Sequence, residues 1–420
     1  MKLKILVLSC LLLQQAHAQF RNFGKVKWTY RTQDKIFTTP ALFRQSILTA
    51  SMDGHLYSLQ RSNGRLNWKF KAGAGIATHP LVTDTTVYFG SYDGHYYAVN
   101  ANSGKLQWQF QTGGERRIGS KGYWSMTPAS MYMEDQYDLF LSSPATDAQH
   151  VYFGSSDSCI YAVNRENGQP VWKYKTNGPI HGGVTYSNNI VLVGSWDTYV
   201  YALDAASGKL IWKFKTNADP KDHVLEGIQS TPVVVGNTVY IGTRDARLYA
   251  MDIMTGQRQW QYLEPGKAWV VGSAVVEGNH VYVGTSDSYL MMDLNASNGE
   301  LRKQVKGGGY IFGAPAVYGN TLCYGDFTGR LFLVNTPNWQ QTAVFETPGR
   351  IENGAQVLDS AGNINFMKIA AGAATDKYST ALAVMEKLFK LGPFVATPVI
   401  AESTVYATST DGTLYAIELK

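Results

Sequence analysis

Seven residues in the middle of the chain combine positive charge with aromatic or imidazole rings, a composition typical of a ligand-binding surface. They are Arg116, Arg117, Lys121, Trp124, His181, Trp196 and Arg244. Cationic and aromatic side chains together suit an acidic ligand, a glycan or the edge of a peptide. We therefore predict that these residues form one binding site, with an envelope protein or an extracellular ligand as the partner.

Catalytic and metal-binding patterns are absent from the sequence. It contains no G-x-S-x-G elbow, no Walker loop and no H-E-x-x-H motif. Its histidines, among them His79, His223 and His280, lack the spacing of metal ligands. We therefore predict a non-enzymatic protein with no catalytic residue, no cofactor-binding residue and no metal ligand.

The elements that position these residues belong to an internal repeat. The segment AVNANSGKLQW from Ala98 returns as AVNRENGQPVW, ALDAASGKLIW and AMDIMTGQRQW, from Ala162, Ala202 and Ala250. Copies follow one another at about 40 residues, and each contains four strand-like runs with Asp-Gly or Gly-bearing turns. A four-stranded antiparallel sheet cannot bury both faces alone, so the copies must stack around an axis as a β-propeller.

The predicted propeller explains why departures from the repeat are informative. Trp196 and Arg244 replace the small or polar residue of other copies, and His181 precedes two glycines where other copies have Thr-Pro or His-Pro. The remaining four residues enter with an insertion at 113–149. Loops at one mouth of a propeller form its usual binding surface, so we predict a mouth patch made by units three to five. The alternative is that Trp196 packs against an insertion and Arg244 makes a local ion pair.

A tryptophan ends most copies of the repeat. We predict that these tryptophans lie on the outermost strands and wedge against the Gly-bearing turn of the next copy, each burying roughly 150–250 Å². They are Trp28, Trp68, Trp108, Trp172, Trp212 and Trp260.

The fold class is all-β, and we predict a single β-propeller of eight four-stranded blades over residues 19–420. The last unit supplies three strands, and Gly24 to Tyr30 reads as the missing fourth, so both termini should close the ring in one blade. Residues 113–149 are an insertion, and residues 340–392 are a divergent or inserted segment with one helix. A ninth blade in this segment is the alternative.

The pattern A-x-(D/N)-x-x-x-G-K-x-x-W resembles the tryptophan-docking motif of the pyrroloquinoline-quinone-type propeller repeats. That family includes quinoprotein alcohol dehydrogenases and a subunit of the outer-membrane barrel-assembly machinery, and this chain is similar to the secreted, enzyme-free branch. The resemblance implies protein contacts in the envelope. It also implies an alternative, a dehydrogenase dependent on pyrroloquinoline quinone and Ca²⁺, although the adjacent cysteines of those enzymes are missing. A carbohydrate-binding or carbohydrate-processing propeller is the third hypothesis.

The first 18 residues read as a signal peptide. Lys2 and Lys4 precede a short apolar run, and Ala16-His17-Ala18 is a cleavage site. We predict a periplasmic or extracellular protein, with lipidation at Cys10 as the alternative. No later apolar run is long enough to span a membrane. The remaining net charge of about +3 does not favour nucleic acid, and we predict a monomer.

Overall fold

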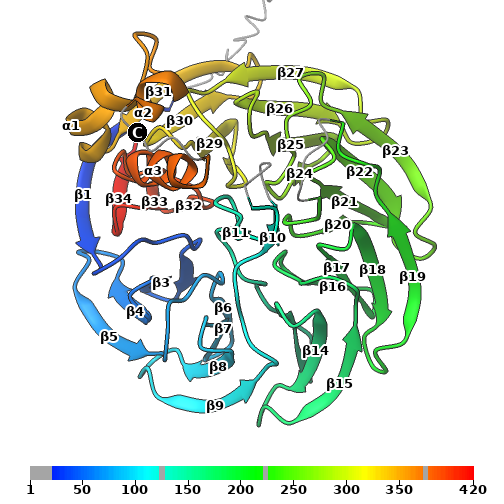
Figure 1. Cartoon of the computed structure of the whole chain (residues 1–420). Coiled ribbons are helices and arrows are strands. Elements are labelled where there is room, and N and C mark those ends of the chain that lie inside the picture. Colours follow the sequence, from blue (N-terminus) through cyan, green and yellow to red (C-terminus); the bar gives the residue numbers. More distant parts are fainter. Residues whose placement is uncertain (1–20, 123–127, 221–225, 372–376) are drawn as a thin grey trace, which may run out of the picture.

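The computed structural model describes residues 21–122, 128–220, 226–371 and 377–420. Within these ranges the chain forms eight four-stranded antiparallel sheets arranged in a ring (Figure 1). Seven of the sheets consist of consecutive strands, which run in order from the innermost to the outermost: β2–β5 (Ala41–Phe43, Ser46–Ala50, His55–Gln60, Leu66–Lys71), β6–β9 (Leu81–Thr83, Thr86–Gly90, His95–Asn100, Leu106–Gln111), β12–β15 (Ala145–Thr146, His150–Gly154, Cys159–Asn164, Pro170–Lys175), β16–β19 (Thr185–Ser187, Ile190–Gly194, Tyr199–Asp204, Leu210–Lys215), β20–β23 (Val233–Val235, Thr238–Gly242, Arg247–Asp252, Arg258–Leu263), β24–β27 (Val275–Glu277, His280–Gly284, Leu290–Asn295, Leu301–Lys306) and β28–β31 (Ala316–Tyr318, Thr321–Gly325, Arg330–Asn335, Gln340–Glu346).

The eighth blade joins the two ends of the chain. Its strands β32 (Val399–Ala401), β33 (Thr404–Thr408) and β34 (Thr413–Leu419) are followed outward by β1 (Phe23–Arg31). Backbone hydrogen bonds run in both directions between Asn22 and Lys420. The predicted all-β propeller with eight blades and terminal ring closure is therefore confirmed, and the nine-blade alternative is wrong.

Six of the eight outer strands carry a tryptophan that links the strand to the next blade. Each indole Nε1 donates a hydrogen bond of 2.8–3.1 Å to a backbone carbonyl in the turn between the third and fourth strands of that blade. The donor–acceptor pairs are Trp28–Arg61, Trp68–Ala101, Trp108–Arg165, Trp172–Ala205, Trp212–Ile253 and Trp260–Ala296. The same ring covers a glycine in each turn: a Cβ on Gly104, where φ is +69°, would lie 2.6 Å from Trp68 Cε3. Only glycine therefore combines this backbone conformation with the close indole contact.

One blade carries a lysine in place of the tryptophan. Lys303 Nζ donates a 2.8 Å hydrogen bond to the Pro337 carbonyl of the following blade. An indole still fills this interface, because Trp339 of the following blade stacks on Tyr282, with ring centroids 5.9 Å apart. The interface thus keeps its aromatic packing although the sequence motif is lost.

Two segments depart from the blade pattern. Residues between β9 and β12 contain the short hairpin β10 (Gly119–Lys121) and β11 (Tyr132–Glu134). Residues between β31 and β32 contain α1 (Pro348–Val357), α2 (Phe366–Ala370) and α3 (Lys377–Phe389). The expectation for 340–392 needs correction: residues 340–346 complete a regular blade, and three helices follow instead of one. The shorter helices start at side-chain caps, Thr347 for α1 and Asn365 for α2, which a search for apolar periodicity does not detect.

No helix among the described residues is long and apolar enough to cross a membrane.

Candidate functional site

Both departures from the blade pattern reach the same end of the propeller. Because the blades are antiparallel meanders, every connection from an outer strand to the next inner strand lies at one end of the ring. The insertion that contains β10 and β11 is such a connection, and so is the segment that contains α1 to α3. Figure 1 shows β10 and β11 near the centre of the ring, and α3 over the blade that contains β32 to β34.

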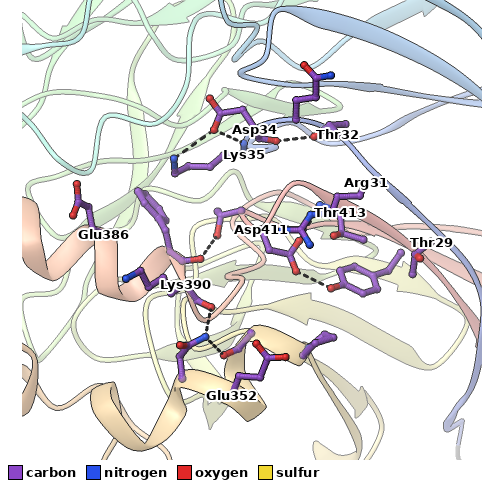
Figure 2. Close-up of a pocket in the computed structure, with 17 residues that line it drawn as sticks. Thr29, Arg31, Thr32, Asp34, Lys35, Glu352, Glu386, Lys390, Asp411 and Thr413 are labelled. Carbon is purple, nitrogen blue, oxygen red and sulfur yellow. Dashed lines mark hydrogen bonds and ion pairs between the residues drawn. The ribbon is translucent and has the colours of Figure 1, made fainter.

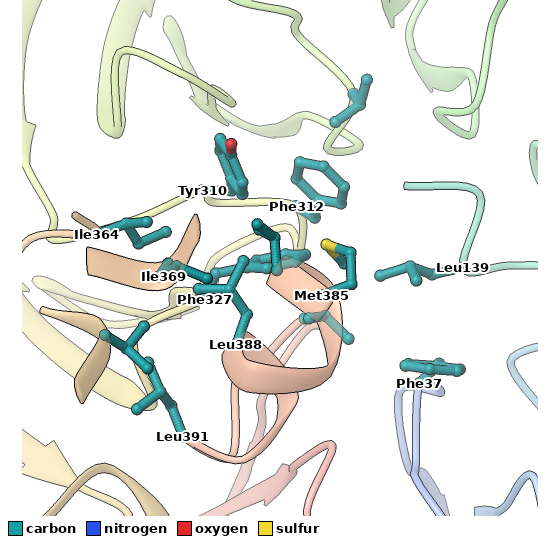
Figure 3. Close-up of a cluster of buried hydrophobic side chains, with 14 of the residues drawn as sticks. Phe37, Leu139, Tyr310, Phe312, Phe327, Ile364, Ile369, Met385, Leu388 and Leu391 are labelled. Carbon is teal, nitrogen blue, oxygen red and sulfur yellow. The ribbon is translucent and has the colours of Figure 1, made fainter. Parts of the chain in front are cut away.

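A hydrophobic cluster closes this mouth (Figure 3). Met385 and Leu388 of α3 lie with Leu139 of the insertion and with Tyr310 and Phe312 of the blades. All five side chains are buried. The mouth is therefore filled by a packed core and is not an open funnel.

Both polar and apolar residues line the axis below this cluster. Backbone N–H groups donate from one blade to a side chain of the next, from Thr39 to His79 Nδ1 and from His79 to Ser143 Oγ, each at 2.9 Å. Burial lowers the pKa of His79 to about 4, so this imidazole is neutral at physiological pH. The cavity that remains at this position has a volume of about 40 Å³.

His181 lies in a buried network and not on a surface patch. Its Nδ1 is 2.8 Å from Asp138 Oδ1, and its Nε2 is 2.7 Å from Ser156 Oγ. The Ser156 hydroxyl also lies 2.8 Å from a carboxylate oxygen of Glu115, to which it donates. Burial lowers the pKa of His181, but the carboxylates of Asp138, Glu115 and Asp135 together outweigh it, so the pKa of His181 is raised.

This network resembles a Ser-His-Asp triad in connectivity but not in access. Asp138, His181 and Ser156 are all buried, and the serine hydroxyl is engaged by the Glu115 carboxylate. A nucleophile must reach a substrate carbonyl, and this hydroxyl faces protein atoms. Because Glu115 and Asp138 belong to the insertion, the network ties the insertion to the third and fourth regular blades.

Arg244 is also buried. Its guanidinium lies 4.4 Å from the ring centroid of Trp196 and 4.2 Å from that of Trp269. Its Nη2 is 2.5 Å from Asp135 Oδ2, and its Nε donates a 2.8 Å hydrogen bond to Gln229. The Trp196 ring packs against buried side chains of the insertion.

The predicted mouth patch is therefore corrected for three of its residues. His181, Trp196 and Arg244 are buried, because the insertion covers them and supplies their partners. Glu115, Asp135 and Asp138 were missed by the sequence analysis. These acidic residues are far in sequence from the residues that they contact. Their indication in the sequence was only indirect: three residues that break the repeat must have partners outside it.

The remaining predicted residues lie at the surface of the insertion. Arg116 and Lys121 are exposed and Arg117 is half-buried, whereas Trp124 lies outside the described residues. A shallow hollow of about 310 Å³ adjoins them, lined by Met52, Gly75, Tyr92, Arg116, Arg117 and Glu134. Met131 and Tyr132 are 45% and 49% exposed. We call the surface formed by Arg116, Lys121, Met131 and Tyr132 the mouth hairpin surface.

A larger groove lies at the rim of the ring, between β1 and the helical segment (Figure 2). Its volume is about 810 Å³. Charges of both signs line it, with Arg31, Lys35 and Lys390 near Asp34, Glu352, Glu386 and Asp411. These residues come from three segments that only the closed ring brings together. No local sequence motif therefore predicted the groove.

The described residues do not fit a quinone cofactor with calcium. They contain no group of three or more His, Cys, Asp or Glu side chains able to hold a metal ion. Cys159 and Cys323 are free and buried. The axial cavity of about 40 Å³ is far below the roughly 300–1,000 Å³ of ligand pockets.

Comparisons with solved structures identify the same architecture in three different proteins. BamB from Moraxella catarrhalis is 17% identical, with a TM-score of 0.66 over 94% of this chain and 99% of that one. The computationally designed protein Ika8 is 14% identical, with a TM-score of 0.66 over 94% and 100% of the two chains. The quinohemoprotein alcohol dehydrogenase ADHIIG from Pseudomonas putida HK5 is 12% identical, with a TM-score of 0.60 over 94% and 75%.

At these identities the three structures show the fold alone. A search of proteins with curated functions finds no match. Residues 18–137 and 156–351 match the sequence family described as outer membrane protein assembly factor BamB, which covers more than half of the chain. The chain therefore belongs to the family of the outer membrane protein assembly factor BamB.

Proposed function

We propose that this protein is a non-enzymatic scaffold of the bacterial cell envelope that takes part in the assembly of outer membrane proteins. Export would use the signal peptide predicted for residues 1–18. The observation that carries the proposal is the family match over most of the repeats. The closed mouth adds support, because a packed core occupies the place where an enzyme of this architecture would admit a substrate.

The mouth hairpin surface is the proposed contact for a protein partner. Tyr132 and Met131 offer exposed apolar area, and Arg116 and Lys121 lie on the same insertion as exposed cations. Tyrosine and arginine are enriched among residues that dominate binding energy at interfaces. A partner segment with acidic residues beside an apolar side chain would match this composition.

Site-specific photo-crosslinking in cells tests the proposal. A photoreactive residue replacing Tyr132 should give a discrete adduct with a component of the outer membrane assembly apparatus. The control position is Asn298, an exposed residue in the β26–β27 turn at the opposite end of the blades. Equal labelling from both positions, or normal outer membrane protein levels in a strain lacking the protein, would contradict the proposal.

A dehydrogenase dependent on pyrroloquinoline quinone is the second candidate, favoured by the likeness to a quinohemoprotein alcohol dehydrogenase. Calorimetric titration with the quinone and Ca²⁺, followed by dye reduction, separates the two candidates. We expect no binding, because the axial cavity is too small. Tight binding with turnover would replace the scaffold proposal with the enzyme.

A further inference from the structure

The outermost strands of the eight blades hold an unequal share of the chain's charge. These strands are β1, β5, β9, β15, β19, β23, β27 and β31 (Figure 1). They carry thirteen of the 37 lysine and arginine residues and one of the 32 acidic residues, Glu346. The rest of the chain carries 24 basic and 31 acidic residues, so the positive charge is concentrated on the circumference.

Two neighbouring outer strands, β15 and β19, carry four of these cations, and all four are lysines. Lys173, Lys175, Lys213 and Lys215 are all exposed, and neither strand contains an acidic residue. We call these two strands the basic arc. Lys213 and Lys215 lie 4.8 and 6.0 Å from the ring centroid of Tyr199, so both ammonium groups lie beside an aromatic face.

The basic arc also exposes aliphatic side chains. Val171, Leu210 and Ile211 are each at least 40% exposed and precede the lysines on the same strands. The arc therefore presents aliphatic groups beside a row of ammonium groups. This is the composition of proteins that rest on a membrane surface, where apolar groups enter the interface and lysines reach the headgroups.

Protection of exposed strand edges does not require these lysines. Charged side chains on edge strands commonly prevent edge-to-edge association. The preceding outer strand, β9, has the same place in its blade and carries Gln109 and Gln111 where β15 and β19 carry lysines. Lys175 Nζ also donates a hydrogen bond to the Asp157 carbonyl. Because β9 has glutamine at the equivalent positions, the fold does not require a lysine there.

We propose that the basic arc is a docking surface for an anionic lipid bilayer. The arc is part of the convex circumference of the ring. Lysines spread over a convex surface can each approach the headgroups of a flat anionic bilayer. Each lysine near an anionic membrane adds an attraction that disappears beyond a Debye length. Docking by this edge leaves the mouth, at one end of the ring, free for a protein partner.

Co-sedimentation with vesicles tests the proposal on residues 19–420, which contain all eight blades. We expect binding to phosphatidylcholine vesicles that contain phosphatidylglycerol, no binding to phosphatidylcholine alone, and loss of binding at high salt. The variant K173Q/K175Q/K213Q/K215Q should bind at least about tenfold more weakly while keeping its melting temperature, because it copies the glutamines of β9. The variant Q109K/Q111K should bind more tightly.

A variant of equal net charge provides the control. Lys35, Lys267, Lys368 and Lys390 lie away from the outer strands and from the mouth hairpin surface, and their joint replacement by glutamine should leave vesicle binding within about twofold of the native protein. The proposal is overturned if both quadruple variants lose binding equally. It is also overturned if the native protein does not bind vesicles that contain phosphatidylglycerol. This holds even if the protein binds an acidic polypeptide such as polyglutamate. Either result would leave the proposed function intact, because crosslinking from Tyr132 tests that function separately.

Discussion

Arg244 Nη2 lies 2.5 Å from Asp135 Oδ2, and neither side chain has any exposed surface. The pair joins a blade to the insertion that covers the mouth, and two indole rings enclose the guanidinium. Burial raises the pKa of Asp135, and the Arg244 charge opposes that rise. A buried charge that loses its partner is costly, so this pair fixes the insertion in one position.

Replacing one member of this pair should destabilise the protein strongly. We expect D135N to lower the free energy of unfolding by about 3–5 kcal/mol, because it leaves the Arg244 charge buried without its counterion. Chemical denaturation measures the loss. The matched control is D84N, which breaks an ion pair between Arg165 and the 78% exposed Asp84 and should cost no more than about 1 kcal/mol. Equal losses would show that burial of the first pair has no energetic consequence.

The His181 network predicts a pH dependence of stability. The folded-state pKa of His181 is raised above 6.5, so the folded state binds more protons than the unfolded state above that pH. The stabilisation from this group is complete below pH 6.5 and is lost as the pH rises through the folded pKa. Burial also raises the pKa of Glu115, which acts in the same direction.

Melting temperatures measured across neutral and mildly alkaline pH check this dependence. We expect H181Q to be less stable than the native protein at pH 6 and to show a smaller decline as the pH rises. The exposed Asn298, which does not titrate, provides the control: N298Q should keep the native pH profile. Parallel profiles for the native protein and H181Q would exclude His181 as the titrating group.

The tryptophan contacts should dominate the cohesion between blades. We expect W108A and W212A each to cost about 3–5 kcal/mol, since a large buried ring and its hydrogen bond are removed. The exposed neighbour Lys213 is the control, and K213A should change stability by less than about 0.5 kcal/mol. Unchanged unfolding midpoints for both tryptophan variants would refute the docking role.

Glycines in the turns separate conformational strain from steric contact. Gly104 and Gly278 both have positive φ, but only Gly104 lies against an indole, and a Cβ at Gly278 would meet nothing within 4 Å. We expect G278A to cost about 1–2 kcal/mol from backbone conformation alone and G104A to cost distinctly more. Thermal denaturation of the two variants measures the difference. Equal losses would mean that the indole moves aside without cost.

Ring closure depends on β1. Removal of Gly24–Tyr30 takes away the outer strand of the closing blade and leaves β34 with a free edge. We expect a deletion variant that unfolds at a clearly lower temperature and associates through that edge. Calorimetry and light scattering measure both effects. A variant that melts like the intact protein and stays monodisperse would show that closure contributes little.

The fold could be predicted from the sequence because its rules are local and repeated. The spacing of Ala98, Gly104 and Trp108 within one segment sets a strand, a turn and a second strand, and repetition sets the stacking. The fourth-strand pattern around Trp28 indicated closure for the same reason. The repeat did not predict the packing of the interface at Lys303, because its indole comes from Trp339 in the neighbouring blade.

The sequence by itself determined the blades, their number, the closing strand and the residues that break the repeat. Only the tertiary structure decided whether those residues face solvent. His181 and Asp138 are 43 positions apart, and Arg244 meets Asp135 only because the insertion folds back over the mouth. An insertion has no second copy with which it can be compared, and its path is set by long-range packing and charge pairing. The burial of the predicted mouth patch therefore could not be derived from the order of its residues.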